Sequence, residues 1–187
     1  MIQVQEVSKS YNGKENVIYN LSFEVKKGEI VGFIGPNGSG KTTTLKMLTG
    51  ILPSDKGKIF IDGKRMTDFN ISAKKQIGYI PDSPDMFLRL KGVEFLNFMG
   101  DVYEVETKAR RERIEKLTKT FELEHVLDAS MVSYSHGMRQ KMMIVATLLH
   151  EPAVWILDEP LTGLDPKSSF VLKKMMKEHA ANGNCVL

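Results

Sequence analysis

The stretch Gly35-Pro36-Asn37-Gly38-Ser39-Gly40-Lys41-Thr42 decides the fold, because it matches the pattern G-x-x-x-x-G-K-[ST]. Residues 29–34 before it are mostly apolar and predict a short buried strand, whereas residues 41–49 after it have the apolar spacing of a helix. A glycine-rich turn between a strand and a helix directs backbone N–H groups and the positive end of the helix toward phosphate oxygens. The sequence therefore predicts phosphate binding here. The alternative is an ordinary glycine-rich turn that is followed by Lys-Thr by chance.

Four side chains indicate that the phosphate compound is a nucleotide and that it is hydrolysed. Lys41 supplies a cation for the β- and γ-phosphates of a nucleotide, and the Thr42 hydroxyl is a suitable Mg²⁺ ligand. Residues 153–157 predict a buried strand that delivers Asp158 and Glu159 at its C-terminal end, where α/β sheets place ligands. Asp158 suits a water-mediated contact to Mg²⁺, and Glu159 suits polarising an attacking water. The alternative is a strand that simply ends in solvent with two acidic residues.

The rest of the chain alternates between strand and helix patterns. Apolar residues predict strands near residues 2–7 and 17–25, and shorter ones at residues 58–61, 77–80 and 185–187. Residues 93–147 have mostly helical patterns, and an amphipathic helix is predicted over residues 166–182. This order predicts an α/β fold with a parallel sheet and a helical insert near residues 90–147.

Composition narrows the class of protein. The 187 residues are 42% hydrophobic and 26% charged, which favours one globular domain over a disordered chain. A formal net charge of +3 is too small to indicate nucleic-acid binding by charge alone. The lone Cys185 suits a reducing cytosol, and the N-terminus lacks the pattern of a signal peptide. The most apolar window, residues 142–149, is far shorter than the ~20 residues of a membrane span.

A second motif lies between the phosphate loop and the acidic strand. Tyr134-Ser135-His136-Gly137-Met138-Arg139-Gln140-Lys141 resembles the ABC signature LSGGQ, with Tyr for Leu, His for the first Gly and Met for Gln. Ser135 is predicted to cap a helix that runs through Leu149. With the two motifs above, the whole chain resembles an ATP-binding cassette (ABC) ATPase. An ordinary capped helix that meets no ligand is the alternative for this motif.

The resemblance implies a fold, two ligands and a set of site residues. The implied fold is a P-loop NTPase with an N-terminal antiparallel β part, a parallel RecA-like core sheet and a helical signature subdomain. ATP and Mg²⁺ would lie between two subunits, with the signature of one facing the γ-phosphate bound by the other. The nucleotide-binding residues would be Tyr11, Gly35, Pro36, Asn37, Gly38, Ser39, Gly40, Lys41, Thr42 and Thr43. The signature residues would be Ser135, His136, Gly137 and Met138, the Mg²⁺ ligands Thr42, Asp82 and Asp158, and the catalytic carboxylate Glu159.

Three of the implied positions need separate comment. Residues 161–165 resemble the D-loop, which crosses the dimer near the opposite phosphate loop and here ends in Asp165. Tyr11 resembles the aromatic residue that stacks on adenine, although a packing role is the alternative. Asp82 occupies the place of the usual Q-loop Gln, and its carboxylate could still offer oxygen to Mg²⁺.

The implied function is that of the ATPase subunit of a bacterial exporter with a separately encoded permease. We expect a homodimer or heterodimer of ATPase subunits, an integral membrane permease as partner, no nucleic acid, and a location on the cytoplasmic face of the cell membrane. The alternatives are a soluble ABC ATPase not coupled to transport, and a nucleotide-binding regulator with little hydrolysis. A role in DNA repair is disfavoured, because too few residues separate Lys41 from Asp158 for a long coiled coil.

The predicted strand at residues 185–187 leads to a further expectation. In the family, the strand that begins here at Cys185 leads to a switch histidine that contacts the γ-phosphate, and the chain ends at Leu187. We therefore expect residues 1–187 to be a nucleotide-binding domain that is incomplete at its C-terminus and hydrolyses ATP weakly.

Overall fold

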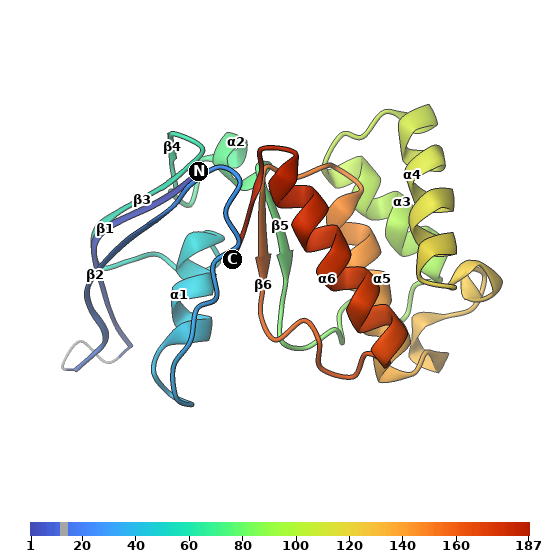
Figure 1. Cartoon of the computed structure of the whole chain (residues 1–187), viewed down its shortest axis with the longest axis horizontal. Helices are drawn as coiled ribbons and strands as arrows, with labels where there is room; N and C mark the ends of the chain where they lie inside the picture. The colour runs from blue at the N-terminus through green and yellow to red at the C-terminus, as the bar shows by residue number, and fades with distance from the viewer. Residues whose placement is uncertain (12–14) are drawn as a thin grey trace. The chain divides into compact units, whose positions relative to one another are not determined.

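The computed structural model describes residues 1–11 and 15–187, which form two compact units (Figure 1). The strand unit comprises Met1–Tyr79, Pro152–Asp158 and Met176–Leu187. The helical unit comprises Ile80–Glu151 and Glu159–Met175. Among the described residues, no helix has both the length and the apolar character that crossing a membrane requires.

A four-stranded antiparallel sheet forms one part of the strand unit. Its order is β2 (Asn16–Val25), β1 (Ile2–Ser10), β3 (Lys56–Ile61) and β4 (Lys64–Arg65). Ile2 in the central strand β1 pairs with Val25 on one side and with Ile61 on the other. All three of these side chains are fully buried, because alternate residues of each strand face the core. The antiparallel N-terminal part is therefore confirmed.

A three-stranded sheet and helix α1 (Lys41–Leu48) also belong to the strand unit. The sheet order is β5 (Ile77–Ile80), β6 (Val154–Leu157) and β7 (Cys185–Val186), and β6 pairs with β7 in parallel. All four residues of β6 are buried, as expected of a strand covered on both faces. Leu45 and Leu48 of α1 share one apolar core with Val154 and Ile156. This packing fixes the start of α1 close to the C-terminal end of β6.

The predicted buried strand over residues 29–34 is wrong. The structure has only an isolated parallel bridge between Ile30 and Val186, supported by a 2.9 Å hydrogen bond from Val31 N to Val186 O. Ile34 is 95% exposed. A strand needs a hydrogen-bonded partner along its length, and within residues 29–34 the described structure has a bridge only at Ile30. An apolar run does not by itself establish that a partner strand lies along its whole length.

Helices make up most of the helical unit. These are α3 (Gly92–Val102), α4 (Thr107–Thr120) and α5 (His136–Leu148), with the short 3₁₀ turns η1 (Glu124–Val126) and η2 (Met131–Ser133). Figure 1 shows α3, α4 and α5 packed together, and apolar residues such as Phe95 and Ile144 are buried between them. Helix α6 (Pro166–Ala181) begins in this unit and ends in the strand unit, which also contains α2 (Ile71–Lys74). The helices predicted between residues 93 and 147 are thus present.

Candidate functional site

The glycine-rich loop leads directly into α1 in the strand unit. Gly40 stands at the N-cap of α1 with a φ of 88°, a left-handed conformation that strongly favours glycine. A Cβ on Gly40 would also lie 3.3 Å from the carbonyl oxygen of Val17 and closer still to the Ile18 side chain. Since glycine has no side chain to cap the helix, the first N–H groups of α1 are available to an anion. This loop therefore has the geometry that phosphate binding needs.

The Lys41 side chain folds back over the same loop. Its Nζ donates to the carbonyl oxygens of Gly35, at 2.8 Å, and Pro36, at 2.9 Å. These bonds hold the ammonium at the mouth of the loop, where it can meet phosphate oxygens.

A hydroxyl and a carboxylate meet beside the loop. Thr42 Oγ1 donates to Asp158 Oδ2 at 2.9 Å, although the two residues are far apart in the sequence. Asp158 directly follows β6 and is only 5% exposed. Paired hard oxygen atoms next to a phosphate-binding loop suit Mg²⁺, which accepts one or two protein oxygens together with phosphate oxygens. The donor set thus fits the metal that the sequence predicted.

Glu159 follows Asp158 and has an unusual backbone. Its φ is 47°, in the left-handed region that non-glycine residues rarely adopt, and its side chain is exposed. Its carbonyl oxygen accepts from the backbone N–H of Thr162 at 3.1 Å, which closes a tight turn. Strain of this kind is found at functional sites, where it aims a side chain. The exposed carboxylate is chemically able to accept a proton from water.

Tyr11 and Asp82 differ in how closely the structure ties them to the loop. The Tyr11 hydroxyl lies 3.0 Å from Oγ1 of Thr43 in α1, and 63% of the residue is exposed. An aromatic ring anchored beside the loop and open to solvent is suited to stacking on a base. Asp82 is exposed shortly after β5 and belongs to the helical unit. Both assignments stay predictions.

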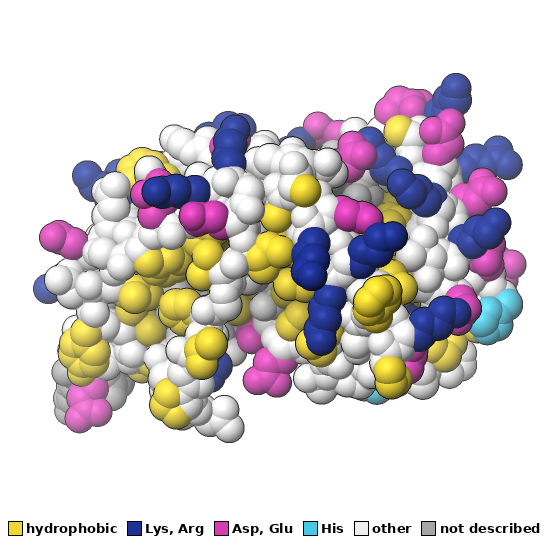
Figure 2. Space-filling model, in the orientation of Figure 1, with side chains coloured by type: hydrophobic (Ala, Val, Ile, Leu, Met, Phe, Trp, Pro, Cys, Tyr) yellow, Lys and Arg dark blue, Asp and Glu magenta, His cyan; other side chains and the backbone are white. Residues whose placement is uncertain are grey.

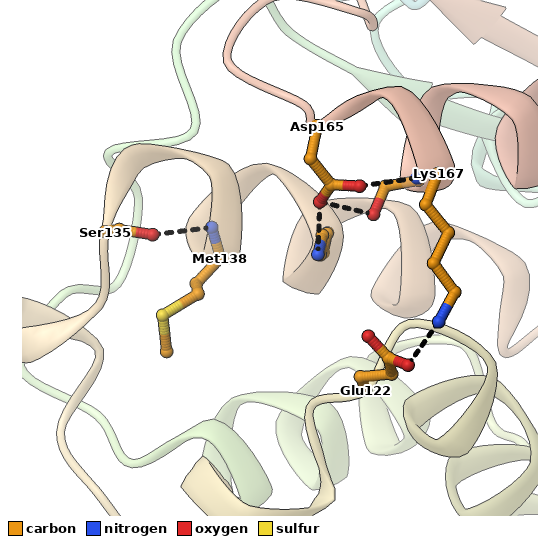
Figure 3. Close-up of polar contacts among 7 residues, drawn as sticks. Glu122, Ser135, Met138, Asp165 and Lys167 are labelled. Atoms are coloured by element: carbon orange, nitrogen blue, oxygen red, sulfur yellow. Dashed lines mark hydrogen bonds and ion pairs between the residues drawn. The ribbon is translucent and has the colours of Figure 1, made fainter.

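The signature segment forms the start of α5 in the helical unit. Ser135 is the N-cap, and its Oγ accepts from the backbone N–H of Met138 at 3.2 Å (Figure 3). The predicted cap is therefore confirmed. His136 and Gly137 occupy the first turn, and Tyr134 is buried immediately before it. What this helix end binds stays a prediction.

Asp165 uses its carboxylate within the chain. It accepts from the backbone N–H of Ser168 at 2.8 Å and from the Ser168 hydroxyl at 2.7 Å, so it caps α6 (Figure 3). It also pairs with Lys141 Nζ at 2.8 Å. The Lys141 ammonium and the Ser168 donors hold the pKa of Asp165 well below its ordinary value. Lys141 was missed as a functional candidate, because no local pattern links it to a carboxylate on a later element.

Comparison with known proteins agrees with this geometry. A family model described as "ABC transporter" matches residues 18–162. The chain is 35% identical to the Bacillus subtilis protein YhcH, an uncharacterized ABC transporter ATP-binding protein, over 95% of the chain. It is also 35% identical to the SkfA peptide export ATP-binding protein SkfE of the same organism, over 98% of the chain and 75% of SkfE. However, the chain spans only 57% of YhcH.

A solved structure extends the likeness to three dimensions. That protein is described as the ATP-binding subunit of an ABC transporter, and it superposes with a TM-score of 0.94 at 35% identity. The match covers all of this chain and 78% of the solved chain.

Proposed function

Because this chain belongs to the ABC transporter ATP-binding family, we propose that it binds and hydrolyses MgATP as the energy-supplying subunit of an exporter with a separate permease. The hydrogen bond between Thr42 and Asp158 carries the proposal. It brings the two motifs that handle phosphate and metal to the same place, beside the ammonium of Lys41. Neither motif would be sufficient by itself.

Each residue of the loop region has a distinct part in this proposal. The N–H groups at the start of α1 and the Lys41 ammonium bind the β- and γ-phosphates, while Tyr11 stacks on the base. Thr42 and Asp158, with Asp82, would hold Mg²⁺, which neutralises phosphate charge when it is bound. Glu159 orients the attacking water and accepts its proton.

The signature end of α5 completes the site in the proposed dimer. Ser135, His136, Gly137 and Met138 of one subunit face the γ-phosphate bound by the other, so that ATP closes the dimer and hydrolysis opens it. Ser135 caps this helix start through the N–H of Met138, and the remaining N–H groups of the first turn support an interaction with an anion. The subunits are either two copies of this chain or this chain and a related one.

Exposed aromatic residues on the helical unit support a protein partner, which we propose is the permease. Phe87 is 42% exposed, and its ring lies 5.4 Å from that of Phe98, which is 43% exposed. Met86 adds a further exposed apolar side chain. Contiguous apolar groups of this kind mark interaction surfaces. The name of SkfE, a peptide export protein, supports export as the direction of transport.

Nucleic acid is not among the proposed partners. On the face shown in Figure 2, Lys and Arg side chains are interspersed with Asp and Glu. A nucleic-acid-binding face instead concentrates basic residues in one patch or stripe. The likeness to transporter subunits supports a place at the cytoplasmic side of a membrane, on a permease.

The test of the proposed function is the Glu159→Gln variant with MgATP. Loss of the base should lower hydrolysis about 10²–10⁴-fold while nucleotide binding is kept. The variant should therefore accumulate as an ATP-bound dimer, seen by size-exclusion chromatography with MgATP and not with MgADP. Glu151→Gln, which changes another exposed carboxylate, is the matched control and should behave as wild type. A Glu159→Gln variant that hydrolyses ATP at the wild-type rate would contradict the assignment.

A further inference from the structure

The first turns of α5 are joined to the segment that follows β6 by several contacts within the helical unit. Gln140 Nε2 donates to the carbonyl oxygen of Pro160 at 3.2 Å. One turn earlier on the helix, the His136 ring and the Gly137 backbone lie against Gly163. The Lys141–Asp165 ion pair closes the far end of the contact. Residues 160–165 are thus held to α5 at their beginning, middle and end.

The middle of this contact leaves no room for movement toward the helix. A Cβ on Gly137 would lie 2.5 Å from the carbonyl oxygen of Gly163, and a Cβ on Gly163 would overlap the His136 ring. Gly163 also has a φ of 76°, so the close approach depends on a conformation that other residues rarely adopt. The Gly163 backbone therefore packs directly against the Gly137 backbone and the His136 ring.

The ion pair is the stronger of the two ends. The Lys141 side chain is 14% exposed and that of Asp165 is 47% exposed, so water competes only in part for the pair. Asp165 accepts two further hydrogen bonds from Ser168, and the low pKa described above keeps it ionised. One carboxylate thereby ties the segment to α5 and to the start of α6.

The same segment begins at the proposed catalytic carboxylate. Glu159 precedes Pro160, and the Glu159 carbonyl oxygen accepts from Thr162, inside the anchored stretch. The left-handed backbone of Glu159 is an uncommon conformation that the surrounding structure must enforce. The anchored stretch of residues 160–165 begins directly after this conformation.

We infer that Lys141 is a positioning residue for ATP hydrolysis: through Asp165 it fixes the segment 160–165 on α5 and so orients Glu159. The inference rests on the proposed function, because it assigns Lys141 a part in the reaction that Glu159 assists. Lys141 itself touches neither the nucleotide nor the reacting water in this scheme. A simpler role in stability predicts that its loss lowers folding and activity together, and the experiment separates these two roles.

The experiment compares Lys141→Gln and Lys141→Arg with wild type. Lys141→Gln removes the charge and should lower kcat about 10- to 100-fold, because small misplacement of a catalytic group is costly. The KM for ATP should change little, since the phosphate loop is not altered. Lys141→Arg keeps a cation within reach of Asp165 and should restore most of kcat. Lys167→Gln is the matched control: it removes a charge that pairs with Glu122 at an exposed position, and it should match wild type (Figure 3).

A second readout needs no nucleotide. Hydrogen exchange of the Thr162 and Ser168 backbone amides should be faster in Lys141→Gln than in wild type, whereas Lys167→Gln should leave it unchanged. The inference is overturned if Lys141→Gln keeps the wild-type kcat, if Lys141→Arg fails to restore it, or if exchange in the segment is unaltered. A parallel loss of kcat, ATP affinity and thermal midpoint overturns it as well. Failure of the proposed function is distinct, because then the wild-type chain itself neither binds nor hydrolyses MgATP.

Discussion

At the scale of single residues, both backbone N–H groups and one side chain of the phosphate loop can bind the ligand. Gly40 allows the loop to enter α1 in a left-handed conformation, and the N–H groups of the helix start then face the ligand. Lys41 adds the one formal positive charge within the loop sequence, and its bonds to Gly35 and Pro36 keep that charge at the loop. The backbone provides the shape of the site, and Lys41 provides much of its affinity for a highly charged ligand.

Lys41→Ala should therefore weaken MgATP binding without disturbing the fold. The variant loses a charge-assisted contact worth about 1.5–3 kcal/mol, which corresponds to a roughly 10- to 150-fold higher Kd. Nucleotide titration by calorimetry or fluorescence measures the change. Lys46→Ala removes the same charge from the other end of α1 and serves as the control. Equal MgATP affinity of Lys41→Ala and wild type would contradict the assignment of this loop as the phosphate-binding site.

At the scale of secondary-structure elements, the contact between α5 and the segment after β6 depends on one glycine. Gly163 combines a φ of 76° with an approach to His136 that leaves no room for a Cβ. Gly183, just after α6, has a similar φ of 83° but nothing within 4 Å of an added Cβ. Substitutions at Gly163 and Gly183 therefore separate the free-energy cost of a left-handed backbone from the cost of steric overlap with neighbouring atoms.

Gly163→Ala should destabilise the protein more than Gly183→Ala. Both variants place a Cβ in the left-handed region, at a cost of about 1–2 kcal/mol. Gly163→Ala must in addition displace the His136 ring or the segment itself, which adds about 1–3 kcal/mol. Chemical denaturation of the two variants and wild type gives the difference. Equal destabilisation by the two substitutions would show that the contact between Gly163 and α5 is loose.

At the scale of the whole molecule, the stability of the fold should depend on pH through one partly buried histidine. His179 of α6 lies edge-on to Trp155 of β6, with ring centroids 5.6 Å apart, inside the strand unit. Burial lowers the pKa of His179 below its ordinary value. The folded protein therefore excludes a proton that the unfolded chain binds below a pH of about 6.5.

The free energy of unfolding should fall as the pH drops from about 6.5 through the folded-state pKa of His179, because protonation then favours the unfolded chain. Above about 6.5 the histidine is neutral in both states and should contribute no slope. Denaturation curves between about pH 5 and 7.5 measure this, and His179→Gln should flatten the dependence. His125→Gln, at an exposed histidine, is the control and should keep the wild-type slope. An unchanged slope in His179→Gln would assign the pH dependence to other groups.

The features that the sequence by itself determined are those set by neighbouring residues. The glycine-rich loop, the start of α1, the Ser135 cap and the buried strand β6 were all predicted, because each depends on residues within about one or two turns of one another. Asp158 was predicted to lie at the ligand-binding edge of the sheet, because it follows a buried strand. Its 2.9 Å bond to Thr42 is a property of the tertiary structure.

Tertiary structure alone decided the features that depend on distant partners. Residues 29–34 have the composition of a buried strand, yet within this run the described structure has a bridge only at Ile30, to Val186. Asp165 was predicted to lie near the opposite phosphate loop of a dimer, and within the chain its carboxylate bonds Lys141 and Ser168. Strand pairing and ion pairing join groups that are remote in sequence, so the tertiary fold determines which groups meet. A local pattern of residues therefore cannot predict these partners.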